Sequence, residues 1–93
     1  MSSGFLFDRS GSCTAGGTAQ DVIVANNGRQ YLIFVNVSDT AMKLAFGAAA
    51  TTDSIVVAAN GGTFTMDGSG FVSTDKLSMF CATTGKKFAA YEG

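Results

Sequence analysis

The fold is decided by one stretch of the chain, residues 29–37, which reads RQYLIFVNV. Successive side chains of an extended strand point to opposite faces, so Leu32 and Phe34 share one face. The opposite face carries four more apolar side chains: Tyr31, Ile33, Val35 and Val37. Because apolar groups lie on both faces, the stretch predicts a central strand of a sheet that is covered on both sides.

A second apolar run precedes this strand. Residues 19–25 contain Val22-Ile23-Val24, and Asn26-Asn27-Gly28 separates the two runs. Asn-Gly accepts positive φ at both central positions of a type I′ turn, which is the favoured connection of a two-stranded hairpin. The sequence therefore predicts that residues 19–25 and 29–37 pair as a hairpin.

Alternation with a period of two continues through the rest of the chain, and no segment shows a sustained helical pattern. Residues 47–53 predict a loop, and Asn60-Gly61-Gly62 and Thr84-Gly85-Lys86 are turn signals. The further predicted strands are 41–46, 54–59, 63–66, 77–83 and 87–92, and Phe71-Val72 begins another short segment. Seven to eight short strands at roughly ten-residue spacing predict an all-β fold, an antiparallel β-sandwich of jelly-roll-like form.

The first 17 residues differ in character from residues 18–93, which form the predicted sandwich domain. Gly and Ser are frequent in residues 10–17, and the apolar patch Phe5-Leu6-Phe7 lies ahead of them. An apolar patch on a Gly/Ser tether suits a flexible N-terminal arm that becomes ordered on a partner. An edge strand of the sandwich accounts for the segment equally well, so both interpretations stay open.

The composition favours a protein that is covered by copies of itself or by a larger assembly. The 93 residues are 46% hydrophobic and 14% charged, the net charge is −1, and the mean hydropathy is +0.27. A small domain has little interior in which to bury so many apolar groups. Low net charge also promotes association.

The same properties argue against nucleic acid and membranes as partners. The six Lys and Arg residues are spread along the chain, whereas nucleic-acid binders concentrate positive charge on one face. The longest strongly apolar run, residues 31–35, is far shorter than the roughly 18 residues of a membrane span. The first residues form no basic leader with an apolar stretch of signal-peptide length, so we expect the chain to stay in the compartment where it is made.

The sequence predicts no catalytic residue, no metal site and no cofactor. It contains no His, the commonest general base and metal ligand. Cys13 and Cys81 are isolated and indicate buried small side chains or free thiols, and a disulfide between them stays open. Four acidic residues fall in or beside turns, where Asp bonds its own backbone: Asp39, Asp53, Asp67 and Asp75.

Phe71 is the one aromatic residue in a Gly-rich loop. It is either a plug at one end of the sandwich or an anchor for a partner, because aromatic side chains dominate both core and interface energetics. The residues that we expect to contact partners are Phe5, Phe7 and Arg9 in the N-terminal segment, with Phe71 as a second choice.

Four segments carry a likeness to a known family: residues 30–39 (QYLIFVNVSD), 42–47 (MKLAFG), 61–64 (GGTF) and the terminal strand pair, residues 76–92. They resemble small all-β virion proteins of tailed bacteriophages, a group of capsid decoration (cement) proteins and related head or tail accessory proteins. The resemblance implies a non-enzymatic protein that is made in the cytoplasm of a bacterial host and located in the virion. It also implies a homo-oligomer, with a trimer favoured, that binds the major capsid protein and stabilises the head shell.

Three other functions compete with capsid decoration. The first is a tail, head-to-tail or host-receptor-binding component of the virion, built on the same sandwich. The second is a free carbohydrate- or ligand-binding module, although Trp is absent and Tyr31 and Tyr91 fall within predicted strands. The third is an enzyme, which the lack of an evident nucleophile and base disfavours. We therefore expect no small-molecule substrate.

Overall fold

The computed structural model describes residues 6–67 and 72–93. In these two ranges the chain is all-β, with strands and turns and no helix. The strands are β1 (Phe7–Asp8), β2 (Gly11–Ser12), β3 (Thr18–Ile23), β4 (Leu32–Asn36), β5 (Met42–Phe46), β6 (Ile55–Val57), β7 (Gly62–Met66), β8 (Leu77–Cys81) and β9 (Lys87–Glu92).

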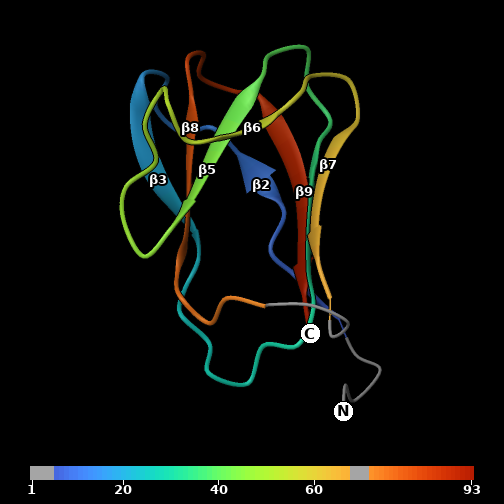
Figure 1. Cartoon of the computed structure of the whole chain (residues 1–93). Coiled ribbons are helices and arrows are strands. Elements are labelled where there is room, and N and C mark those ends of the chain that lie inside the picture. The colour runs from blue at the N-terminus through green and yellow to red at the C-terminus, as the bar shows by residue number, and fades with distance from the viewer. Residues whose placement is uncertain (1–5, 68–71) are drawn as a thin grey trace.

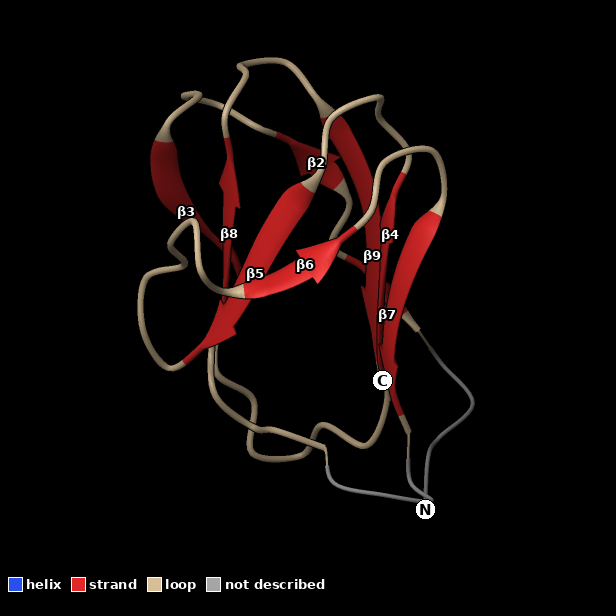
Figure 2. Cartoon of the chain, turned by 45° about the horizontal axis from the view of Figure 1, so that its top comes forward, coloured by secondary structure: helices blue, strands red, loops and turns tan. Residues whose placement is uncertain are grey.

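Two antiparallel sheets pack face to face (Figures 1 and 2). Sheet A has the order β1–β9–β4–β7, with β2 also on β9, and sheet B has the order β3–β8–β5–β6. The pairs nest along the chain: β1 and β2 pair with β9, β3 with β8, β4 with β7, and β5 with β6. This nesting of first strand with last is the pairing of a jelly roll, so the predicted jelly-roll-like sandwich is confirmed.

The core lies between the inward faces of the two sheets. In sheet A, Phe34 of β4 stacks on Phe88 of β9, with ring centroids 5.0 Å apart. Sheet B covers them with buried side chains from all four of its strands: Ile23, Met42, Leu44, Val57, Leu77, Met79 and Cys81. Burying one such large apolar side chain stabilises the fold by about 1.5–3 kcal/mol, so period-two alternation decides which face of each strand turns inward.

The positions of most predicted strands are confirmed. The predicted strand 87–92 is β9, and the predicted strands 41–46 and 63–66 each differ by one residue from β5 and β7. β3, β6 and β8 occupy parts of the predicted strands 19–25, 54–59 and 77–83, with β3 beginning one residue earlier. Alternation is visible in the sequence, whereas the residue at which pairing stops depends on the neighbouring strand.

The hairpin predicted between residues 19–25 and 29–37 is wrong. β3 pairs with β8 in sheet B, whereas β4 lies in sheet A, so Asn26-Asn27-Gly28 carries the chain from one sheet to the other. Neither Asn27 nor Gly28 has positive φ. Instead, Asn26 Oδ1 accepts the N–H of Gly28 at 3.0 Å, and the C=O of Asn26 accepts the N–H of Arg29 at 3.1 Å. A turn of this kind does not require the strands on either side of it to pair.

β4 is central, as predicted, but within residues 6–67 and 72–93 no second layer of strands covers its outward face. It lies between β9 and β7, and its inward side chains Leu32 and Phe34 are fully buried. Ile33 and Val35 on the outward face are only half-buried. They are flanked in register by Tyr91 and Ala89 of β9, which shield them laterally without a covering layer. The apolar outward face therefore remains partly open to solvent.

The N-terminal segment runs along the edge of sheet A. β1 and β2 pair with opposite ends of β9, and the N–H of Arg9 between them bonds the C=O of Ala90 at 2.6 Å. The next residues turn inward, so that Cys13 is 1% exposed and lies in the core. Figure 1 shows β2 beside β9, behind the strands of sheet B.

The loop of residues 47–54 lies over the outward face of sheet B. The buried Ala50 donates its N–H to Ser78 Oγ at 3.0 Å, and Ser78 lies on β8 and is itself 1% exposed. Figure 1 shows this loop in lime, beside β3 and β8. The two sheets therefore differ, because a loop covers part of the outward face of sheet B.

Candidate assembly surface

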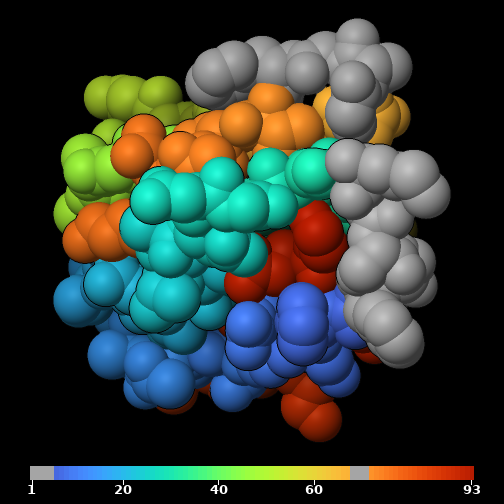
Figure 3. Space-filling model, turned by 90° about the horizontal axis from the view of Figure 1, so that it is seen from below, coloured from blue at the N-terminus to red at the C-terminus, as the bar shows by residue number. Residues whose placement is uncertain are grey.

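Four segments of the chain meet at one end of the sandwich, which Figure 3 shows from below. They are the first described residues, the connection from β3 to β4, the residues before β8, and the end of β9. Glu92 of β9 links them and is 1% exposed. An unpaired buried carboxylate costs several kcal/mol, so its partners determine how this end is built.

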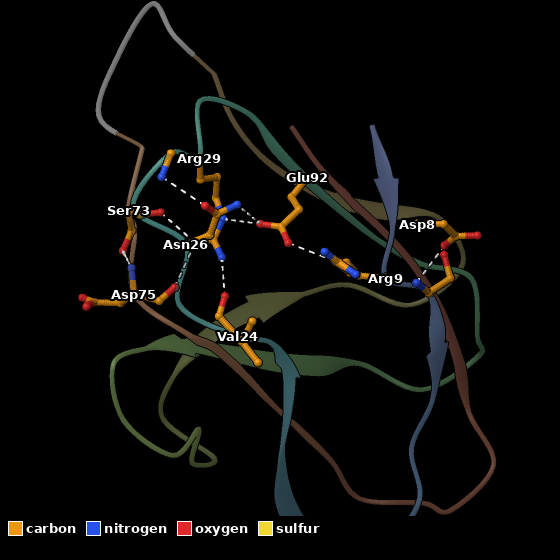
Figure 4. A network of polar contacts seen from close by, with 10 residues as sticks. Asp8, Arg9, Val24, Asn26, Arg29, Ser73, Asp75 and Glu92 are labelled. Atoms are coloured by element: carbon orange, nitrogen blue, oxygen red, sulfur yellow. Dashed lines mark hydrogen bonds and ion pairs between the residues drawn. The ribbon is translucent and has the colours of Figure 1, made fainter. Parts of the chain in front are cut away.

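Arg29 is the main partner of Glu92 and is itself 4% exposed (Figure 4). Its Nε donates to Glu92 Oε1 at 2.9 Å. Its Nη1 donates to the carbonyls of Ser73 and Asp75, each at 2.8 Å, and its Nη2 donates to the carbonyl of Val24 at 2.9 Å. The planar fork of the guanidinium thus ties two loops to the last strand.

Asn26 and Arg9 complete the shell of donors around Glu92. Asn26 Nδ2 donates to Oε1 at 3.2 Å, and Arg9 Nε donates to Oε2 at 3.0 Å. Burial alone raises the pKa of Glu92, but the hydrogen bonds from Arg29, Asn26 and Arg9 and the charge of Arg29 outweigh it, so the pKa lies below its usual value. Glu92 is therefore ionised at neutral pH.

Arg9 connects this buried network to the surface. Its side chain is 41% exposed, and its guanidinium carbon lies 5.5 Å from the centroid of the Phe7 ring, a cation–π contact. Phe7 is 56% exposed, and its neighbour Leu6 is 53% exposed. The structure therefore brings together two of the residues predicted to contact partners, an aromatic ring and a cation at the edge of sheet A.

Phe5 and Phe71, the other two residues predicted to contact partners, lie outside the described residues. The remaining exposed large apolar side chains of the described part are Val24, Val37, Ile55 and Val56. Val24 precedes Asn26 at the same end of the sandwich as Phe7, and Val56 lies on β6 at an edge of sheet B. We define the N-terminal edge patch as Leu6, Phe7 and Arg9.

Arg29 and Glu92 belong to this candidate surface and were not predicted from the sequence. One signal for Glu92 was available, because it shares an alternating face with Phe88 and Ala90, both of which are apolar and buried. An acid in that position must find a buried cation. Nothing in the local sequence identifies Arg29 as that cation, since the pair is 63 residues apart.

The two cysteines are free thiols buried in the core, as predicted. Cys13 Sγ donates to the carbonyl of Cys81 at 3.6 Å. Burial, and then the neighbouring Cys81, raise the pKa of the Cys13 thiol. A raised pKa disfavours the thiolate, which is the reactive form of cysteine.

The described residues contain neither a metal-binding cluster nor a membrane-spanning helix. No group of three or more His, Cys, Asp and Glu side chains there is arranged to hold a metal ion. In the same ranges no helix has the length and apolar character to cross a bilayer. Comparison with known proteins finds no family model, no curated protein and no solved structure that matches this chain.

Proposed function

We propose that this protein is a non-enzymatic structural component of a bacteriophage particle, a capsid decoration (cement) protein that binds the head shell as an oligomer. The observation that carries the proposal is the N-terminal edge patch, where Leu6 and Phe7 are exposed beside an arginine that a buried carboxylate holds in place. Aromatic residues and arginine are enriched among the side chains that dominate binding energy at protein interfaces.

The position of the patch suits binding to a surface. Phe7 belongs to a strand paired with β9, and Arg9 is fixed by both Glu92 and the Phe7 ring, so little conformational entropy is lost when they are covered. A protein that binds only the assembled shell shifts the equilibrium toward the shell. Many weak contacts on a repeating lattice add to this effect. The resemblance of residues 30–39 and 42–47 to phage virion proteins supports the same function.

Addition of purified protein to heads that lack it tests the proposal. The heads come from the virus that encodes this chain, after deletion of its gene, and bound protein is measured by co-sedimentation. We expect saturable binding that Phe7→Ala weakens by about tenfold, a loss of about 1.4 kcal/mol.

Val56→Ala is the matched control, because Val56 is 61% exposed but lies on the opposite sheet. The control is expected to bind like the unchanged chain. Binding to tails, seen by electron microscopy of labelled protein, would replace the head location with a tail component. Absence of binding to any part of the particle would contradict the proposal, and a specific hit on a glycan array would favour a carbohydrate-binding module instead.

A further inference from the structure

The outward face of sheet A is a regular, nearly uncharged surface. In register, Asp8, Tyr91, Ile33 and Thr65 form one row across β1, β9, β4 and β7. Ala89, Val35 and Thr63 form the next row, and Lys87 of β9 opposite Ser12 of β2 begins a third. We name these nine residues the sheet A face.

No strand of the described part of the chain covers the sheet A face. By contrast, the loop of residues 47–54 bonds to the outward face of sheet B through Ala50 and Ser78. Ile33, Val35, Ala89 and Tyr91 are half-buried by their neighbours and have apolar groups left to cover. Outward positions of an antiparallel sheet that faces water are ordinarily polar.

The two charges of the sheet A face lie at opposite ends of it. Asp8 lies opposite Tyr91, and Lys87 lies four residues back along β9, about 14 Å away at the usual rise of a strand. Both residues are exposed. The uncharged row of Ala89, Val35 and Thr63 lies between them.

This arrangement is self-complementary under one particular two-fold rotation. The two-fold axis lies in the plane between the two copies and runs perpendicular to the strands, through the row of Ala89 and Val35. Rotation about this axis places β9 of one copy over β9 of the other, with the two strands antiparallel. The row with Asp8 then meets the row with Lys87, and the apolar middle rows stack. Asp8 of one copy lies over Ser12 of the other, one strand away from Lys87, so each carboxylate meets an ammonium group diagonally. An axis along the strands would instead place Lys87 over Lys87. Face-to-face sheets pack about 10 Å apart, a distance that an aspartate and a lysine side chain together can span.

We propose that the sheet A face binds a second copy of this chain, forming a two-fold symmetric dimer with the Asp8 of each copy paired with the Lys87 of the other. The proposal rests on the proposed function in that it names the self-association surface of the decoration protein. It differs from the trimer implied by the family resemblance, because a two-fold contact of one face with itself closes after two copies.

The area of the sheet A face determines how tightly the two copies are expected to bind. Three strands of five or six residues, with the two-residue strands β1 and β2 along one edge, cover about 300 Å² in projection. This area is small beside the roughly 800 Å² that each partner buries in a standard interface. The dimer alone is therefore weak and forms at concentrations of about 10 μM and above. Attachment of both copies to one shell would raise their effective concentration.

Charge reversal tests the dimer. Sedimentation equilibrium of the full chain is measured over about a hundredfold range around about 10 μM, at low salt, for the unchanged chain and four variants. Lys87→Glu and Asp8→Lys are each expected to weaken the dimer about tenfold, because each change places two like-charge pairs in the interface. The double variant Asp8→Lys, Lys87→Glu is expected to restore it.

Lys43→Glu is the matched control, since Lys43 lies on the outward side of β5 in sheet B and is expected to leave the dimer unchanged. A chain that stays monomeric over the whole range would overturn the proposal, as would a trimer or a dimer on which Lys87→Glu acts no more than Lys43→Glu. A chain that is monomeric and loses head binding on Lys87→Glu would also overturn the dimer, and would show that the sheet A face binds the shell instead. Failure of the dimer and failure of the decoration function can be distinguished. A monomer that still binds particles contradicts only the dimer, and a dimer that binds no particle contradicts only the decoration function.

Discussion

Glu92 shows how one residue can organise an end of the molecule. The carboxylate is buried beneath three donors from Arg29, Asn26 and Arg9, and Arg29 in turn saturates three loop carbonyls. A buried ion pair adds little net stability compared with apolar residues, but removing one partner leaves a charge without compensation. The network therefore specifies how the loops meet more than it strengthens the fold.

Replacing the two arginines separately is expected to have unequal effects. Arg29→Met leaves Glu92 buried without its main partner and should destabilise the protein by about 3–5 kcal/mol. Arg9→Met removes an ion pair whose arginine is 41% exposed, and should cost less than about 1 kcal/mol. Urea unfolding followed by far-ultraviolet circular dichroism measures both losses. Equal losses would show that the buried network does not hold this end together.

Acid is expected to destabilise the fold through Glu92. Its pKa is lowered in the folded state, so its contribution is fully present above the unfolded value near pH 4.5 and is lost as the pH falls through the folded pKa. The measurement is the urea midpoint between neutral pH and about pH 2, a range that spans ordinary carboxyl pKa values. Glu92→Gln should show a shallower fall than the unchanged chain. Asp8 and Asp39 also have lowered pKa values, from hydrogen bonds with Ser10 and Lys86 respectively. Both residues are present in the unchanged chain and in Glu92→Gln, so part of the fall is common to the two proteins. A fall of identical depth in the two proteins would show that Glu92 does not contribute.

The elements were more predictable from sequence than the connections between them. Strands such as β4 and β9 could be predicted, because burial of every second side chain places apolar residues at alternate positions of the sequence. The connection at Asn26-Asn27-Gly28 was not predictable, because local turn chemistry fits both a hairpin and a crossing between sheets. The crossing is accompanied by a contact far away in sequence, from Arg29 to Glu92.

The turn at Asn60-Gly61-Gly62 contrasts with that failure. Asn60 and Gly61 have φ values of 62° and 99°, the left-handed conformation that their residue types favour, so this turn signal is confirmed. Their N–H groups bond the carbonyls of Ser38 and Asn36, each at 2.7 Å. The turn leads from β6 in sheet B to β7 in sheet A, so here too the connection crosses between sheets.

Gly62 is expected to tolerate no side chain at this crossing. A Cβ there would lie 2.2 Å from the carbonyl oxygen of Ala58 and 2.7 Å from its nitrogen, both backbone atoms that cannot move aside cheaply. Gly62→Ala should therefore cost about 1–3 kcal/mol in urea unfolding. Gly28→Ala is the matched control, because its Cβ would meet only Asn26 Oδ1, at 3.6 Å, and its effect should stay within about 1 kcal/mol. A Gly62→Ala variant as stable as this control would contradict the close approach.

For the molecule as a whole, the sandwich could be predicted but the order of its strands could not. Alternation and turn spacing predict an antiparallel sandwich of seven to eight strands, and the described residues form nine, because β1 and β2 of the N-terminal segment are added. Which strands lie side by side depends on pairings such as Phe7 with Glu92, 85 positions apart. The N-terminal edge patch was predictable as residue types, since Phe7 and Arg9 stand out in a Gly- and Ser-rich segment, whereas the buried carboxylate that holds Arg9 was not.

Removal of residues 1–13 is expected to destabilise the whole sandwich. The deletion takes away β1 and β2, the hydrogen bond between Ser10 and Ala90, and Cys13 from the core. The deletion removes one buried side chain and exposes the edge of β9. Together these changes should lower the free energy of unfolding by about 2–5 kcal/mol. Removal of residues 1–5 retains all of these contacts and is the control. Equal stability of the two truncated proteins would show that the segment is dispensable for folding.

If this protein is built to be covered within a larger particle, as we propose, it must be present in that particle in a defined number of copies. Quantitative mass spectrometry of purified virus particles, with peptides of the major shell protein as the internal standard, gives the ratio of the two chains. We expect a fixed, many-copy ratio that is the same in separate preparations and is lost when the gene is deleted. Particles that contain none of the chain, or traces that vary between preparations, would contradict it.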